Sequence, residues 1–403
     1  MSGEKGFEVR SALFVVCLLV AHGAAAQTHL ATQVPPSFLG GVPQGEASAT
    51  PTALTVVEAI SRGLEHNLGL LNAEEQLGRA RGARWQSLAA LLPNASARVA
   101  ESRQKVNLEA FGFPLPEGVP PVVGPFNVFD ARVRVSQSVF DLHAINAARA
   151  ERFNQAAASY NVKTARDLVV LVTANAYLQT LAASARMASA HAQVESADVL
   201  FKQASDMKAS GLVAGIDVLR AEVQLGSERQ RATAAKNEFE KSKLQLARII
   251  GLPTGQDFTL SDELPFVPAP SMTLEQALEQ AYRTRPDYLA ALERVKAAEA
   301  ARSAASAEYL PSVDLNADYG AIGLTVGSAR NTYAVVGAVH IPIFNGGRTI
   351  GHVAQAEADL RSRRAEADDL KTGVYYDVKN AFLDLEATQE QLEVATRART
   401  LAA

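Results

Sequence analysis

The side chains that could do chemistry in this sequence are scattered, and no spacing joins them into a site. Asp368 and Asp369 fit a solvated, charged helix face, and no glycine-rich phosphate-binding pattern occurs. The lone cysteine, Cys17, lies in an apolar N-terminal run. The histidines beyond the N-terminus lack the spacing of a metal motif such as H-x-x-x-H; they are His66, His143, His191, His340 and His352. The sequence therefore predicts no enzyme, no cofactor and no metal site.

The N-terminus has the pattern of an export signal, predicted to cover residues 1–26. Lys5 and Arg10 precede an apolar run, and small residues then fit a cleavage site after Ala26. Cleavage would remove Cys17 from the mature chain. The alternative is a retained N-terminal anchor. Residues 27–53 would form a flexible N-terminal segment.

The composition favours long, closely packed helices over a globular enzyme. Alanine is abundant, aromatic residues make up 6%, and the net charge is −4. No basic patch argues for nucleic acid binding. After Ala26 no uninterrupted apolar stretch of about 18 residues follows, so entry into a membrane would require strands.

An internal repeat organises the chain. The segment from Leu54 matches the segment from Met272 at a shift of 218 positions, with 11 identities in 44 residues, where chance would give roughly four. The match resumes at a shift of 204–205, because the first copy carries about 13 extra residues. Prolines mark this insertion at 111–127, which predicts a loop. The expected parts are a first repeat over 54–251, a proline-rich linker over 252–271, and an incomplete second repeat over 272–403.

Each repeat opens with a predicted helix that stops at a proline. In the first copy the helix runs from Thr55 or Thr52 to about Leu91 and stops before Pro93. In the second it runs from Thr273 to Tyr309, and Pro286 predicts a kink after Arg285.

After each helix the apolar period changes to two, which predicts two strands per copy. One face of these strands is apolar, with residues such as Val133, Val135, Ala317 and Tyr319. The other is more polar. Candidate pore-facing residues on it are Arg132, Arg134, Asp314, Asn316 and Asp318. The alternative is a hairpin whose polar face meets solvent.

A long helical hairpin is expected to follow the first strand pair. No proline or glycine occurs from Ala144 to Ser210, which predicts a helix near 100 Å long. Gly211 fits a left-handed helix cap, and Asp217 complements the dipole at the start of a return helix that ends near Ile250. In the second copy Gly346 and Gly347 allow a sharp turn between strand and helix.

These motifs resemble the TolC-like outer-membrane efflux channels. The similarity rests on the helix-opening T-x-x-x-A-I/L pattern and on the Leu-Pro stops at Pro93 and Pro311. It rests further on the strand–helix corner with Pro342, Phe344, Gly346 and Gly347, and most strongly on the tip sequence 210–222.

The resemblance implies a fold class that is mainly α with membrane β. Long antiparallel helical hairpins would form an α-barrel, and four β-strands per protomer would join a trimeric 12-stranded β-barrel. It implies an outer-membrane exit duct with a periplasmic helical extension, in contact with outer-membrane lipid. Its partners would be two further copies of the chain, a periplasmic adaptor, and an RND, ABC or MFS pump. The adaptor would dock at the tip, on Ser210, Gly211, Leu212, Val213, Asp217, Val218 and Leu219.

The chain is about 53 residues shorter than two equal repeats would require. A second tip would be expected near position 416, beyond residue 403. We therefore expect a truncated gene product. The alternatives to a channel are a non-conducting remnant and a periplasmic coiled-coil adaptor.

Overall fold

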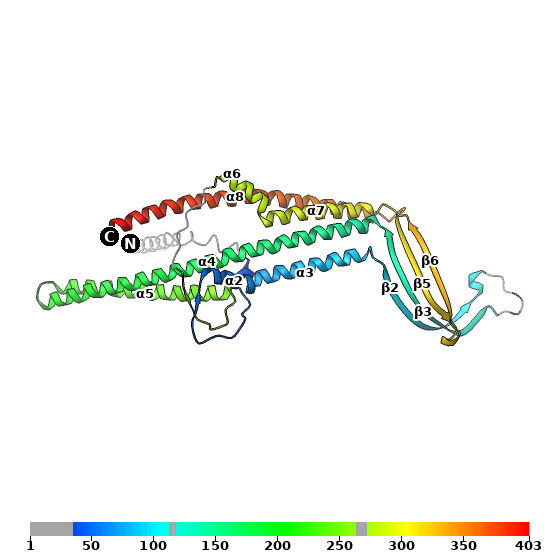
Figure 1. Cartoon of the computed structure of the whole chain (residues 1–403), viewed down its shortest axis with the longest axis horizontal. Helices are drawn as coiled ribbons and strands as arrows, with labels where there is room; N and C mark the ends of the chain where they lie inside the picture. The colour runs from blue at the N-terminus through cyan, green and yellow to red at the C-terminus, as the bar shows by residue number, and fades with distance from the viewer. Residues whose placement is uncertain (1–34, 113–115, 117, 119, 263–271, 403) are drawn as a thin grey trace, which may run out of the picture. The chain divides into compact units, whose positions relative to one another are not determined.

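The computed structural model describes residues 35–112, 116, 118, 120–262 and 272–402. The predicted signal peptide therefore lies outside the described residues. The chain forms two compact units, one from residues 1–74 and 165–268 and the other from residues 75–164 and 269–403. Figure 1 shows the elements of both.

The first unit joins the beginning of the chain to the later part of its longest helix. Its elements are η2 (Pro36–Leu39), β1 (Thr52–Leu54), α2 (Val56–His66), the start of α3 (Leu68–Ala89), the later part of α4 (Leu142–Ala209), α5 (Gly215–Ile249) and β4 (Phe258–Leu260). β1 and β4 pair in parallel. The N-terminal segment that was expected to be flexible thus contains the short elements η2 and β1 within residues 35–54. The expected linker contains β4 at residues 258–260.

The core of the first unit lies where α4, α5 and the short strands meet. Tyr177 is 1% exposed and its hydroxyl donates a hydrogen bond to the Leu54 carbonyl oxygen over 2.9 Å. Burial raises the pKa of Tyr177 to about 12, and a hydrogen bond with Asp262 adds to the shift. The side chains packed around it include Leu246, Ile249, Ile250 and Phe258.

The second unit contains a four-stranded sheet and the helices next to it. Its elements are the rest of α3, β2 (Asn94–Asn107), η3 (Glu109–Phe111), β3 (Val122–Phe140), the start of α4, α6 (Leu274–Thr284), α7 (Pro286–Ala307), β5 (Ser312–Gly323), η4 (Val326–Ser328), β6 (Arg330–His340) and α8 (Arg348–Ala402). Helix α7 packs along α8, and it is rich in buried alanines, among them Ala297 and Ala304.

The opening helices of the two repeats correspond to one another element by element. Helices α2 and α3 correspond to α6 and α7 at a constant shift of 218, with identical lengths. Both repeats begin with a capping box, Thr55 with Glu58 and Thr273 with Gln276. In each box the two residues satisfy amide groups that the helix itself leaves unpaired.

The prediction of one unbroken opening helix in the first repeat is wrong. The chain leaves helical geometry at Asn67, whose φ of −68° and ψ of 126° are those of extended backbone. Arg285 takes nearly the same angles at the kink that Pro286 predicted. The break at Asn67 is fixed by tertiary hydrogen bonds of its buried side chain instead of by a proline.

The four long strands form one antiparallel sheet in the order β2-β3-β5-β6. Each repeat contributes one hairpin, and the hairpins join through β3 and β5, as Figure 1 shows. Strands β2 and β6 lie at the edges and have a neighbour on one side among the described residues. Four strands are too few to close a barrel within one chain.

The last part of the insertion predicted as a loop over 111–127 is strand, from Val122 onward. Strand β3 begins at Val122, and its residues up to Val128 pair with β2 alone, beyond the end of β5 at Gly323. Pro125 is tolerated there because the strand has no neighbour on its other side. The first repeat therefore carries a longer hairpin than the second, visible in Figure 1.

The long helix and its tip agree with the prediction. Helix α4 has 68 residues, about 100 Å at 1.5 Å per residue. It ends at Ala209, and Gly211 follows with φ of +71°. The amides of Gly211 and Leu212 donate to the carbonyls of Lys208 and Met207. This is the hydrogen-bond pattern of a glycine C-cap.

One stretch of α4 is more apolar than the sequence reading suggested. By length and composition this helix could cross a membrane, since an 18-residue window has a mean hydropathy of 1.5. Buried residues of α4 recur at helical spacing, for example Val169, Val172 and Ala176. Within the structure, 39% of this window is buried.

Candidate functional site

The candidate pore residues all lie on one face of the four-stranded sheet. In the register, Arg134 stands opposite Asp318, Ser136 opposite Asn316, and Ser138 opposite Asp314. Residues directly opposite one another share a face. The structure therefore brings Arg132, Arg134, Asp314, Asn316 and Asp318 together, as the alternation predicted.

Arg132 is the centre of the polar face. Its guanidinium contacts the Asp130 carboxylate at 2.5 Å and the Asp318 carboxylate at 3.3 Å. These side chains are between 23% and 28% exposed, so the ion pairs are only partly shielded from solvent. One arginine thus holds two carboxylates from neighbouring strands. Asp130 is a residue that the sequence analysis did not select.

On the opposite face of the sheet, two neighbouring rows are apolar across all four strands. One row consists of Ala95, Val135, Ala317 and Val335, and the next of Ala97, Val133, Tyr319 and Tyr333. Tyr333 is 78% exposed and Val335 65% exposed. Apolar side chains exposed in continuous rows indicate a surface that contacts lipid or another protein.

A small polar groove lies at the end of the sheet next to α3. Its volume is about 430 Å³, and its lining includes Asn94, Ser136, Ser138, Asp314 and Asn316. Two predicted pore residues, Asp314 and Asn316, therefore share a water-accessible recess.

The tip of the α4–α5 hairpin presents the predicted docking residues in two environments. Gly211, Leu212, Asp217 and Leu219 are exposed, with Leu212 at 71% and Leu219 at 53%. Val213 and Val218 are half-buried. Asp217 lies in the first turn of α5 and pairs with Arg220 at 3.3 Å.

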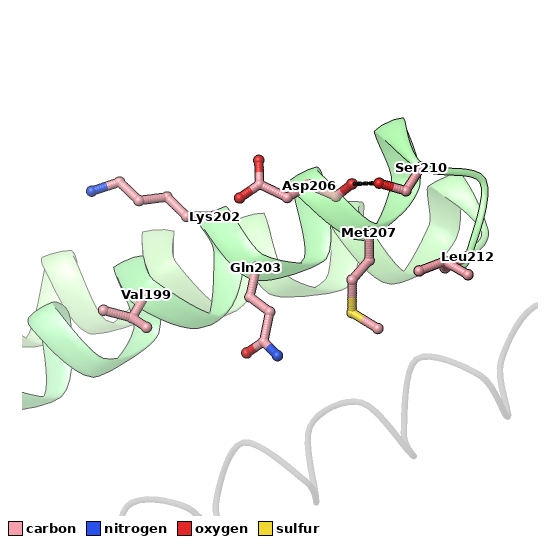
Figure 2. Close-up of a pocket in the computed structure, with 7 residues that line it drawn as sticks. All are labelled: Val199, Lys202, Gln203, Asp206, Met207, Ser210 and Leu212. Atoms are coloured by element: carbon pink, nitrogen blue, oxygen red, sulfur yellow. Dashed lines mark hydrogen bonds between the residues drawn. The ribbon is translucent and has the colours of Figure 1, made fainter.

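An open groove runs along α4 just before the tip. Figure 2 shows its lining, which consists of Val199, Lys202, Gln203, Asp206, Met207, Ser210 and Leu212. The Ser210 hydroxyl donates to the Asp206 carbonyl oxygen over 3.0 Å, so this side chain supports the last turn of α4. The apolar members Val199, Met207 and Leu212 are all exposed.

The strand–helix corner of the second repeat has the sharp turn that its glycines predicted. Gly346 and Gly347 have φ values of +65° and +85°. Phe344 is 89% exposed. Asn345 donates to the Thr349 hydroxyl, and Thr349 donates to a Glu308 carboxylate oxygen over 3.1 Å. Pro342 precedes the turn directly after β6.

Glu308 gathers polar groups that the sequence analysis did not connect. His352 Nδ1 lies 2.9 Å from its carboxylate and His143 Nδ1 lies 3.9 Å from it. Desolvation acts to raise the pKa of Glu308, but hydrogen bonds from His352 and Thr349 outweigh it and hold that pKa below its usual value. Among the described residues no His, Cys, Asp and Glu group fits a metal ion.

An open four-stranded sheet with one polar and one apolar face, together with a long helical hairpin, defines a class of outer-membrane channel proteins. The comparisons with known proteins agree. The family model described as outer membrane efflux protein matches residues 59–252 and 277–402. The chain belongs to the outer membrane efflux protein family. It is an outer-membrane protein with a periplasmic helical part.

Individual relatives cover most of the chain at low identity. Protein CyaE of Bordetella pertussis is 27% identical over 94% of this chain and 80% of its own length. Outer membrane protein TolC of Escherichia coli is 24% identical over 65% of this chain and 56% of its own length. The outer membrane protein VceC of Vibrio cholerae superposes with a TM-score of 0.72 at 20% identity, covering 85% of this chain and 82% of that structure.

Proposed function

We propose that three copies of this chain join edge to edge, β2 of one sheet beside β6 of the next, to form a twelve-stranded barrel that conducts solutes out of the cell. The observation that supports this proposal is the open four-stranded sheet. Within the described residues, β2 and β6 each have a neighbouring strand on one side only. The sheet also has apolar rows on one face and polar rows on the other. In a bilayer the edge groups of a sheet must be paired, and closure by further copies pairs them.

The barrel would be a passive duct. Energy would come from an inner-membrane pump of the RND, ABC or MFS class, connected through a periplasmic adaptor. This role, as the exit of a tripartite efflux or type I secretion system, fits relatives whose names refer to efflux and to pyoverdine export.

The adaptor would dock at the helical tip formed by residues 210–219. Support comes from the exposure of Leu212 and Leu219 and from the groove with Val199 and Met207 beside them. Exposed apolar side chains at the end of a rigid hairpin suit contact with another protein.

Membrane fractionation and complementation test the channel role. The expressed chain should float with the outer membrane and migrate as a heat-modifiable trimer. It should also restore drug resistance to a strain that lacks its own channel but keeps the pump and adaptor. Recovery in the soluble fraction would favour a periplasmic structural protein, and a trimer without rescue would favour a non-conducting remnant.

A pair of matched substitutions tests the tip. Leu219→Asp and Leu244→Asp each place a charge at an exposed leucine of α5, at 53% and 71% exposure. Leu219 lies at the tip and Leu244 near the other end of the helix. We expect both variants to keep the trimer and Leu219→Asp alone to lose rescue. Equal rescue by both would contradict docking at this tip.

A further inference from the structure

The polar face of the sheet carries an excess of positive charge toward the end that adjoins the extended β2–β3 hairpin. Three successive rows of the register contain its charged residues. They are Asp130 and Arg330 in the first row, Arg98 and Arg132 in the second, and Arg134 and Asp318 in the third. These rows therefore hold four arginines and two aspartates in each chain.

The ion pairs show which arginines carry the excess positive charge. Arg132 contacts both aspartates, at 2.5 Å and 3.3 Å. Arg98, Arg134 and Arg330 form no ion pair within the described part of the chain, and all three are exposed. With four arginines and two aspartates, these rows carry a net charge of +2 per chain.

The other end of the same face has the opposite character. Asp314 stands opposite Ser138, four residues along β5 from Asp318, in the groove with Ser136 and Asn316. No arginine or lysine of the sheet shares these lower rows. The positive charge is therefore confined to one level of the wall and is not a general property of the sheet.

We propose that Arg98, Arg134 and Arg330 form a ring that selects for negatively charged solutes. This inference rests on the proposed function, since it requires the polar face of three copies to line the barrel. Rings of arginine or lysine attract anions and repel cations in a pore. A wall of low dielectric strengthens the field at that level, and salt screens it over about 10 Å at 0.1 M.

The test is the reversal potential of the purified full-length protein in a planar lipid bilayer under a KCl gradient at low ionic strength. The wild type should reverse on the chloride side of zero. The double variant Arg98→Gln/Arg134→Gln should lower the chloride-to-potassium permeability ratio by about twofold or more. Neither arginine has an ion-pair partner to lose, so the fold should be retained.

Arg103→Gln is the matched control. It removes one positive charge from β2, the strand that carries Arg98, but residue 103 lies on the opposite face from Arg98, in register with Asn127 and beyond the end of β5. We expect it to leave the permeability ratio unchanged. An equal shift in this variant would show that overall charge, not the ring, sets the selectivity.

The outcomes separate this inference from the proposed function. A channel that conducts but reverses on the potassium side, or that is unaffected by the double variant, overturns the selective ring and leaves the channel role intact. A trimer that inserts and carries no current overturns the channel role and the ring together.

Discussion

The two repeats bend their opening helices at equivalent positions, but different chemistry holds each bend. Asn67 is fully buried; its amide nitrogen donates to the carbonyls of Phe38 and Ile249, at 2.8 Å and 3.4 Å, and its oxygen accepts from Gly69 over 2.9 Å. Arg285, 218 positions later, is 30% exposed and pairs with Asp287 and Asp377 at 2.6 Å and 2.9 Å. The repeat thus preserves backbone geometry and not the interactions that stabilise it.

The long helices of the two repeats also differ in burial, and the helix of the first repeat is the more buried. On α4, Val169 and Tyr177 are buried in the core of the first unit. A shift of 205 places Val374 and Phe382 at the corresponding positions of α8. Val374 is buried and Phe382 is half-buried, while Val394 further along is 68% exposed. The first repeat is therefore more fully packed within one chain than the second.

Equivalent substitutions in the two repeats should differ most in their cost to stability when the side chain at each bend is removed. Asn67→Ala leaves three buried backbone groups without a partner and should lower the free energy of unfolding by about 2–4 kcal/mol. Arg285→Ala breaks partly exposed ion pairs and should cost up to about 1 kcal/mol. Denaturant unfolding of the purified protein measures both. Equal costs would contradict the contrast between a buried and a solvent-exposed bend.

A smaller difference in stability should follow when each repeat is given the residue that the other repeat has at one equivalent position. A Cβ on Gly63 would lie 2.7 Å from Thr173 Oγ1, so Gly63→Ala should destabilise the protein by about 1–3 kcal/mol despite better helix propensity. The equivalent residue is Ala281, and Ala281→Gly should cost about 0.5–1 kcal/mol through propensity alone. A stabilising Gly63→Ala would mean that α2 does not pack tightly on α4.

The smallest difference concerns the hydroxyl of Tyr177. Tyr177→Phe introduces the residue type that the second repeat has at Phe382, and it should cost about 1 kcal/mol by removing the bond to Leu54. Because the pKa of Tyr177 is raised from 10.0 to about 12, its neutral form stabilises the fold below pH 10, and this contribution is lost between pH 10 and 12. Between pH 10 and 12, the free energy of unfolding should fall less steeply for Tyr177→Phe than for the wild type. Identical slopes for the variant and the wild type would contradict a buried hydroxyl.

The sequence predicted the elements that leave a local signal. Pro286 marked the second bend, Gly211 marked the tip, and alternation marked the faces of the strands, all of which the structure confirms. Asn67 was missed because an extended residue held by side-chain hydrogen bonds from distant segments has no local signature. The repeat could have revealed it, since a shift of 218 maps Asn67 onto Arg285.

Only part of the polar face of the sheet could be predicted from the sequence. Alternation selected Arg132 and Asp318 for the same kind of face, but the register that brings them to 3.3 Å depends on how two hairpins pair across the repeat. Asp130 was missed for the same reason. The strand extension at Val122 was hidden by prolines that usually indicate loops.

Native mass spectrometry of the detergent-solubilised protein tests most directly whether the open edges of β2 and β6 are closed by other copies. The account predicts a particle with the mass of three chains that falls apart to monomers when β6 is disrupted by Val335→Pro, because proline has no backbone N–H and is tolerated poorly within a strand. A stable single chain that stays in solution without detergent would contradict it.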